Sequence, residues 1–172
     1  MGTSRILLDL ESATLPTANP ATLTKVTSSG TPPTNAPVLT YNGLDYSDST
    51  DQAAMWNLRL PDDYLSGGTL TFLWSHTAAT SGSVIWKAGA ELVVASAGDV
   101  DAASYNAADA AAAVTVPGTV GQFKETSIAL TMTGAVAGAF CGVFLGRDAD
   151  AGGDTATGGV GRILAVQLAY TA

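Results

Sequence analysis

Residues 69–76 read Thr-Leu-Thr-Phe-Leu-Trp-Ser-His, and this stretch decides the fold class of the 172-residue chain. Its large apolar side chains Leu70, Phe72 and Trp74 occupy every second position. Because successive side chains of a β-strand point to opposite faces of the sheet, this spacing predicts a strand with one buried face.

The same two-residue period recurs on both sides of this stretch, in the apolar series Trp56, Leu58, Leu60 and Leu164, Val166, Leu168, Tyr170. Further strand candidates are residues 4–10, 37–41, 83–96, 122–133 and 139–146. Proline and glycine turns separate these segments at the spacing of a sandwich. We therefore predict an all-β fold, an antiparallel two-sheet sandwich of about eight strands that is jelly-roll-like. The residues expected to be buried are Leu70, Phe72, Leu164, Val166 and Leu168.

The low content of basic residues argues against two classes of binding partner, nucleic acids and anionic membranes. Charged residues make up 13% of the chain, and 15 acidic residues against 7 basic ones give a net charge of −8. Nucleic acids and anionic membranes are bound through Lys and Arg clusters, and the sequence contains no such cluster, so we expect neither partner. A surface rich in Thr, Ser, Gly and Ala suits packing against neighbouring subunits, and it equally fits a plain extracellular-type β domain.

Two regions are expected, with residues 1–41 as an N-terminal strand and proline-rich extended arm and residues 42–172 as a jelly-roll β-sandwich domain. The stretch 14–35 holds four of the seven prolines. The arm either drapes over a neighbouring molecule or adds an edge strand to its own domain. The alanine-rich segment 101–113 forms either a short helix or a low-complexity loop. The apolar run 6–8 is too short for the core of a signal peptide, so synthesis in the cytoplasm is expected.

The single histidine, His76, and the single cysteine, Cys141, show no catalytic pattern. A Ser-His-Asp triad would have to use His76, but no Gly-x-Ser-x-Gly motif accompanies it. Cys141 lies in the apolar run 139–145 and is interpreted as a small buried hydrophobe. We expect no enzyme and no catalytic residue, with His76 at the edge of a loop. The three tryptophans fall in strand patterns that are typical of core packing, although a lectin-like groove stays an alternative.

A glycine-rich loop near the C-terminus holds the one candidate metal site. Asp148, Asp150 and Asp154 lie within seven residues and offer oxygen ligands of the kind that calcium takes. The closing glutamate of an EF-hand loop is missing. An ion pair between Arg147 and one of these aspartates, which would pin the loop between two strands, is favoured over a calcium site. No other cofactor is expected.

Three segments resemble small structural proteins in the virions of tailed bacteriophages. They are residues 54–64 with the following glycine turn and 69–74, then 82–87, and then 145–155 with the closing strand 161–170, so the resemblance covers about residues 42–170. It implies a jelly-roll domain in a virion, as a head decoration, tail or fibre component made in the host cytoplasm. We interpret the chain as a capsid decoration protein that stabilises the particle through protein–protein assembly. The alternative is a carbohydrate-binding module of a tail tip or fibre.

An assembly role predicts a homo-oligomer. Lys and Glu are depleted at the centres of interfaces, and this chain has three of each. The symmetry of phage surfaces suggests a trimer, seated on the major capsid protein or on another virion protein.

Overall fold

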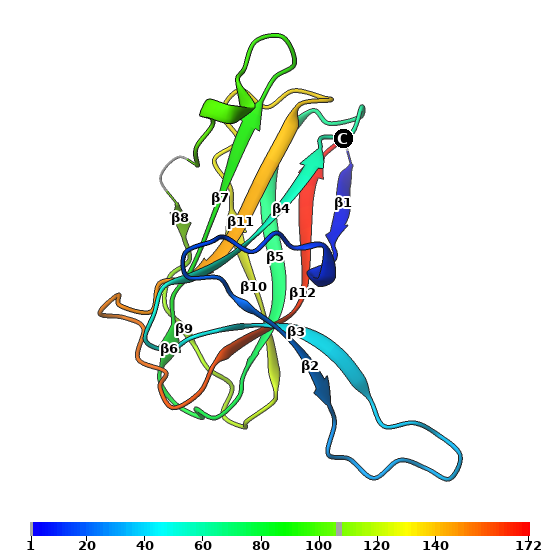
Figure 1. Cartoon of the computed structure of the whole chain (residues 1–172), viewed down its shortest axis with the longest axis vertical. Helices are drawn as coiled ribbons and strands as arrows, with labels where there is room; N and C mark the ends of the chain where they lie inside the picture. The colour runs from blue at the N-terminus through cyan, green and yellow to red at the C-terminus, as the bar shows by residue number, and fades with distance from the viewer. Residues whose placement is uncertain (1, 106–107) are drawn as a thin grey trace.

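A computed structural model describes residues 2–105 and 108–172. Its strands form two principal sheets that pack as a sandwich, with a small two-stranded sheet at one end (Figure 1). The six-stranded sheet contains β10 (Phe123–Ala129), β5 (Ser66–His76), β12 (Gly161–Thr171), β3 (Thr40–Tyr46), β2 (Thr22–Thr27) and β1 (Thr3–Leu8). The four-stranded sheet contains β4 (Gln52–Arg59), β11 (Phe140–Arg147), β7 (Trp86–Val93) and β8 (Asp109–Ala110). The small sheet pairs β6 (Ser83–Val84) with β9 (Val114–Thr115).

All strand pairs are antiparallel, which confirms the predicted all-β sandwich. The twelve strands of the described residues exceed the expected eight, partly because the segment 83–96 breaks at Ile85 and sends β6 and β7 to different sheets. Two 3-10 turns, η1 (Leu10–Ser12) and η2 (Val100–Ala102), are the only helical elements among the described residues, and neither is long enough to cross a membrane.

The core lies between the two principal sheets and is rich in aromatic side chains. Trp86 of β7 contacts Tyr46 of β3 and Phe72 and Trp74 of β5, with ring centroids 5.3 to 5.5 Å apart and the planes steeply inclined. All four side chains are buried. Aromatic rings prefer this edge-to-face geometry, so Trp86 joins the two layers.

One of the five predicted core residues does not lie in the core. Leu70, Phe72, Val166 and Leu168 are buried, but Leu164 is half-exposed. The register between β12 and β5 shifts between Ile163 and Ala165, and this irregularity inserts one extra residue into the alternation. Ile163 therefore points inward in place of Leu164.

The N-terminal residues are part of the sandwich. β1 pairs along its whole length with β12, from Thr3 opposite Thr171 to Leu8 opposite Val166. Leu8 and Leu10 also join the core. The division expected between residues 41 and 42 falls inside β3, so the structure does not divide the chain there. β1 therefore adds a strand to its own domain, which is one of the two roles expected for the arm.

The strand expected at 37–41 begins only at Thr40, and Pro37, which has no N–H to donate to a ladder, lies outside it. β2 and β3 pair from Thr22–Asp45 to Thr27–Thr40, and their connection extends away from the body of the sandwich (Figure 1). The alanine-rich stretch 101–113 contains the end of η2 and the short strand β8. Residues 106 and 107 lie outside the described part, so the helix alternative is not tested over them.

Candidate functional site

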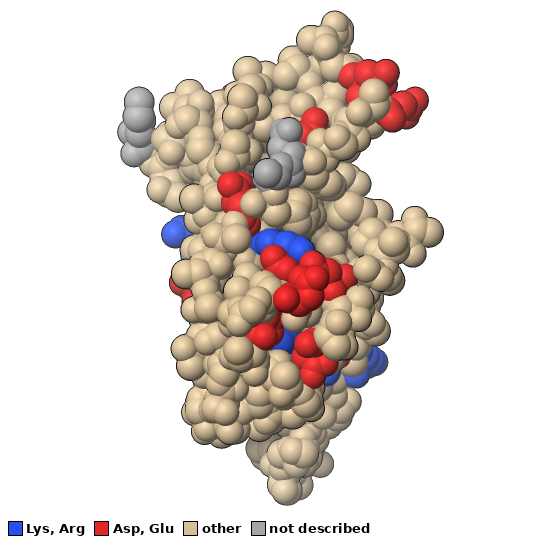
Figure 2. Space-filling view, turned by 90° about the vertical axis from the view of Figure 1, so that its left-hand side faces the viewer, with Lys and Arg blue, Asp and Glu red and all other residues tan. Residues whose placement is uncertain are grey.

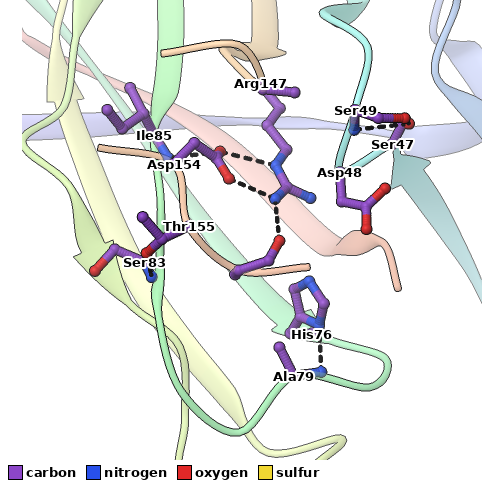
Figure 3. A network of polar contacts seen from close by, with 12 residues as sticks. Ser47, Asp48, Ser49, His76, Ala79, Ser83, Ile85, Arg147, Asp154 and Thr155 are labelled. Carbon is purple, nitrogen blue, oxygen red and sulfur yellow. Dashed lines mark hydrogen bonds and ion pairs between the residues drawn. The ribbon is translucent and has the colours of Figure 1, made fainter. Parts of the chain in front are cut away.

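The glycine-rich loop that follows β11 is held by a buried ion pair. Arg147 donates through Nε and Nη2 to the two carboxylate oxygens of Asp154, at 2.9 and 2.6 Å, and both side chains are almost completely buried. Arg147 also donates to the carbonyl oxygen of Ala156 at 2.7 Å, and Asp154 accepts from the backbone N–H of Ile85 at 3.0 Å (Figure 3). Asp154 is therefore an internal partner of Arg147, the pairing favoured from the sequence, and it is not free to bind a metal.

The other two aspartates of the loop meet a residue that sequence reasoning missed. Carboxylate oxygens of Asp148 and Asp150 lie within 4.8 Å of each other and of Asp51, in the loop before β4. Lys87 of β7 donates to Asp51, and its ammonium nitrogen lies 3.7 Å from a carboxylate oxygen of Asp148, so one positive charge offsets part of the negative charge of this cluster. Partial burial raises the pKa of Asp148, and the neighbouring carboxylates add to the rise against the effect of Lys87. Figure 2 shows acidic side chains grouped around basic ones on this face, amid a surface that is largely uncharged.

His76 ends β5 and is buried, which corrects the expectation of a loop-edge histidine. Its Nδ1 accepts from the backbone N–H groups of Ala78 and Ala79, at 3.3 and 2.8 Å, so the neutral ring carries its proton on Nε2. Burial lowers the pKa of His76, and the guanidinium of Arg147 lowers it further. Figure 3 shows the imidazole beside Arg147 and Asp48. This histidine fixes the turn after β5.

Three buried side-chain nitrogens in the described residues have no hydrogen-bond partner within the protein: His76 Nε2, Trp86 Nε1 and Arg147 Nη1. Buried polar atoms of this kind are usually satisfied by ordered water. Cys141 is fully buried as expected, and this burial raises the pKa of its thiol to about 12. A thiol with such a pKa is a poor nucleophile at neutral pH.

A groove of about 630 Å³ lies between the β2–β3 hairpin and the outer face of the six-stranded sheet. Phe123, the first residue of β10, is 64% exposed, and Tyr41 of β3 is half-buried. Hydroxyl groups come from β2 and the turn that follows it. The nine lining residues, none of them charged, are Val26, Thr27, Ser28, Ser29, Leu39, Tyr41, Gly121, Phe123 and Leu164.

An ion pair lies next to this groove, on the same face of the sheet. Arg162 of β12 donates through Nε and Nη2 to both carboxylate oxygens of Asp45 on β3, at 2.6 and 2.8 Å. The hydrogen bond to Asp45, together with one to Tyr41, raises the pKa of Arg162. The guanidinium therefore anchors β12 to β3 and steadies Tyr41 beside the groove.

The sequence does not reveal the groove, because its two aromatic residues, Tyr41 and Phe123, lie on strands that are far apart in the chain. In the alternative interpretation, the tryptophans were the aromatic residues expected to line a lectin-like groove. Trp56, Trp74 and Trp86 are all in the core. The exposed Phe123 and the register of β3 against β2 are visible only when the sheet is assembled.

No protein-family model and no curated protein matches the chain. Among solved structures it is similar to a native family 35 carbohydrate-binding module from Clostridium thermocellum, with a TM-score of 0.52 and 11% identity over 96% of this chain and 97% of that one. It is also similar to an arabinose-bound family 51 α-L-arabinofuranosidase, with a TM-score of 0.52 and 10% identity over 93% of this chain and 23% of the enzyme. A tailspike protein of bacteriophage CBA120 gives a TM-score of 0.36 with 10% identity over 96% of this chain and 19% of the tailspike, too low to support an argument. At these identities the likeness is one of fold, a jelly-roll β-sandwich.

Proposed function

We propose that the chain is a glycan-binding module whose ligand lies in the groove between the β2–β3 hairpin and Phe123. This was the alternative function drawn from the sequence, and it now becomes the leading one. The observation that carries it is the groove itself, in which an exposed aromatic ring and a second, half-buried one border a row of hydroxyl side chains.

The chemistry of a sugar matches this lining. The C–H face of a pyranose ring is apolar and packs on aromatic rings such as Phe123 and Tyr41, while its hydroxyl groups exchange hydrogen bonds with hydroxyls such as that of Thr27. A concave site lined by apolar and aromatic side chains with a few polar groups is the usual form of a small-molecule site. The similar fold of the family 35 carbohydrate-binding module agrees with this class of function.

A glycan array followed by calorimetric titration of the glycan that binds best tests the proposal. Phe123→Ala is expected to weaken binding at least about tenfold, or about 1.4 kcal/mol, because covering an aromatic ring contributes about that much or more. Phe140→Ala is the matched control, since Phe140 is also an exposed strand phenylalanine but does not line the groove. If the chain retains no glycan, or if both variants bind equally well, the proposal is wrong.

The proposed role is binding without catalysis, in keeping with the internal role of His76 in its turn. A place in a phage virion, on a tail tip or fibre, and capsid decoration as the other possible placement stay predictions from the sequence resemblance. Mass spectrometry of purified particles from a host that carries the gene tests both placements. Absence of the chain from such particles would remove them while leaving the glycan proposal to its own experiment.

A further inference from the structure

The outer face of the six-stranded sheet has an almost uncharged area over β1, β12, β5 and β10. Alternate residues of these strands point away from the core. They are Arg5 and Leu7 of β1, Ala165, Gln167 and Ala169 of β12, Thr69, Thr71 and Leu73 of β5, and Glu125, Ser127 and Ala129 of β10. Arg5 and Glu125 are the only charged residues in this set, and neither forms an ion pair within residues 2–105 and 108–172.

This area combines a protruding apolar side chain with a hollow. Leu7 is 75% exposed, the highest value among the large apolar side chains of the described residues. Leu7 also forms one wall of a hollow of about 170 Å³, whose lining includes Ala165, Leu73 and Glu125. A knob and a hollow on the same face are what a two-fold symmetric contact requires, because each copy then offers both halves of the contact.

The strand register fixes where the two charges lie. Residues that face one another on neighbouring strands form rows across the sheet. One row begins at Arg5 on β1 and passes through Ala169 to Ala129 on β10. A second row runs from Ala165 on β12 across β5 to Glu125 on β10. Arg5 and Glu125 therefore occupy opposite corners of an area three strand spacings wide and four residues long, roughly 14 Å by 13 Å. Because this area is nearly square, a two-fold axis along its other diagonal exchanges the two corners.

We propose that two copies of the chain form a dimer through this face about that diagonal axis. The guanidinium of Arg5 then meets the carboxylate of Glu125 in the second copy, twice per dimer. The same axis carries Leu7 to a point between Ala165 and Leu73 of the second copy, which is where the hollow lies. The sheets of the two copies cross at nearly a right angle, one of the two ways in which sheets pack face to face.

Sedimentation equilibrium of the full chain from about 1 to about 100 μM tests the dimer. Leu7→Asp is expected to raise the dissociation constant at least about tenfold, because the contact would then bury a carboxylate. Leu39→Asp is the matched control, since Leu39 is 68% exposed but lies on the hairpin, outside this face. Circular dichroism of each variant checks the fold. A wild-type chain that stays monomeric at about 100 μM, or a Leu7→Asp variant as dimeric as the wild type, overturns the proposal.

A charge exchange tests the orientation of the two copies. Arg5→Glu and Glu125→Arg are each expected to weaken the dimer several-fold, because each places like charges together twice across the interface. The double variant restores the opposite pairs and is expected to return to within about threefold of the wild-type dissociation constant. If the double variant dimerises no better than the single ones, Arg5 does not meet Glu125 and the diagonal arrangement is wrong.

Discussion

Arg147, at the end of β11, holds Asp154 seven residues further along the chain through two parallel hydrogen bonds that are closed off from solvent. The pair fastens the loop between β11 and β12 to the sandwich, and through Ile85 it also fastens the break between β6 and β7. Two charges withdrawn from water are tolerated only when they are paired and hydrogen-bonded in this way.

Removing one partner of this pair is expected to be costly. Asp154→Asn leaves the guanidinium of Arg147 buried without a counter-charge and should lower the free energy of unfolding by about 3–5 kcal/mol. Asp62→Asn is the control, because Asp62 pairs with Arg59 on the open surface and should change the stability little. Urea denaturation of both variants measures the difference. A loss for Asp154→Asn as small as that for Asp62→Asn would show that the loop is held by other contacts.

The stability of the protein is expected to fall as the pH drops below about 6.5, the pKa of an unfolded histidine. The folded-state pKa of His76 is lowered, so the unfolded chain binds the proton first, and stability is lost between the unfolded and folded pKa values. For one proton, the free energy of unfolding changes with pH by at most about 1.4 kcal/mol per pH unit. His76→Asn keeps an acceptor for the Ala79 N–H but does not titrate. Thermal unfolding between pH 7 and pH 5 should therefore show a shallower decline in this variant, and identical declines would contradict the assignment.

The irregularity in β12 predicts a difference between two leucines of the same strand. Leu168→Ala removes a fully buried side chain and should cost about 2–5 kcal/mol. Leu164→Ala removes a half-exposed side chain and should lower the free energy of unfolding clearly less. Strict alternation along β12 would instead bury both leucines and make the two losses of stability equal. Chemical denaturation of the two variants decides between these outcomes.

Calcium is expected to leave the melting temperature of the wild-type protein unchanged, because the ammonium group of Lys87 already pairs with Asp51 and lies close to Asp148, two of the three carboxylates of the cluster. Lys87→Gln removes that charge and leaves three neighbouring carboxylates without it, which is the kind of oxygen-rich site that calcium takes. This variant should be less stable in chelator and gain melting temperature in millimolar calcium. A calcium-dependent rise in the wild-type protein would restore the calcium interpretation of the loop.

Much of the sandwich could be predicted because period two is a local property of the chain. Leu70, Phe72 and Trp74 alternate without interruption, and all three are buried. Leu164 escaped prediction because a register shift depends on the neighbouring strand, which the sequence of β12 does not reveal. The burial of His76 was not foreseen, because it depends on how the chain folds around the end of β5, where the backbone N–H groups of Ala78 and Ala79 donate to the imidazole.

The candidate site was less accessible to sequence reasoning. The aspartate loop was found as a cluster, yet the sequence could not tell which aspartate pairs with Arg147. Asp51, nearly a hundred residues away, joined the cluster only through the fold. The groove beside Phe123 and the corners formed by Arg5 and Glu125 likewise depend on strands that are distant in the chain.

The sequence by itself determined that this is a β-sandwich with a mostly neutral surface, because alternation, turn residues and charge content act within a few neighbouring residues. Only the tertiary structure decided which charges are paired, which aromatic ring faces solvent and which side chains share a face. Those relationships are set by register between strands, and a shift of a single residue moves every following side chain to the opposite face of the sheet.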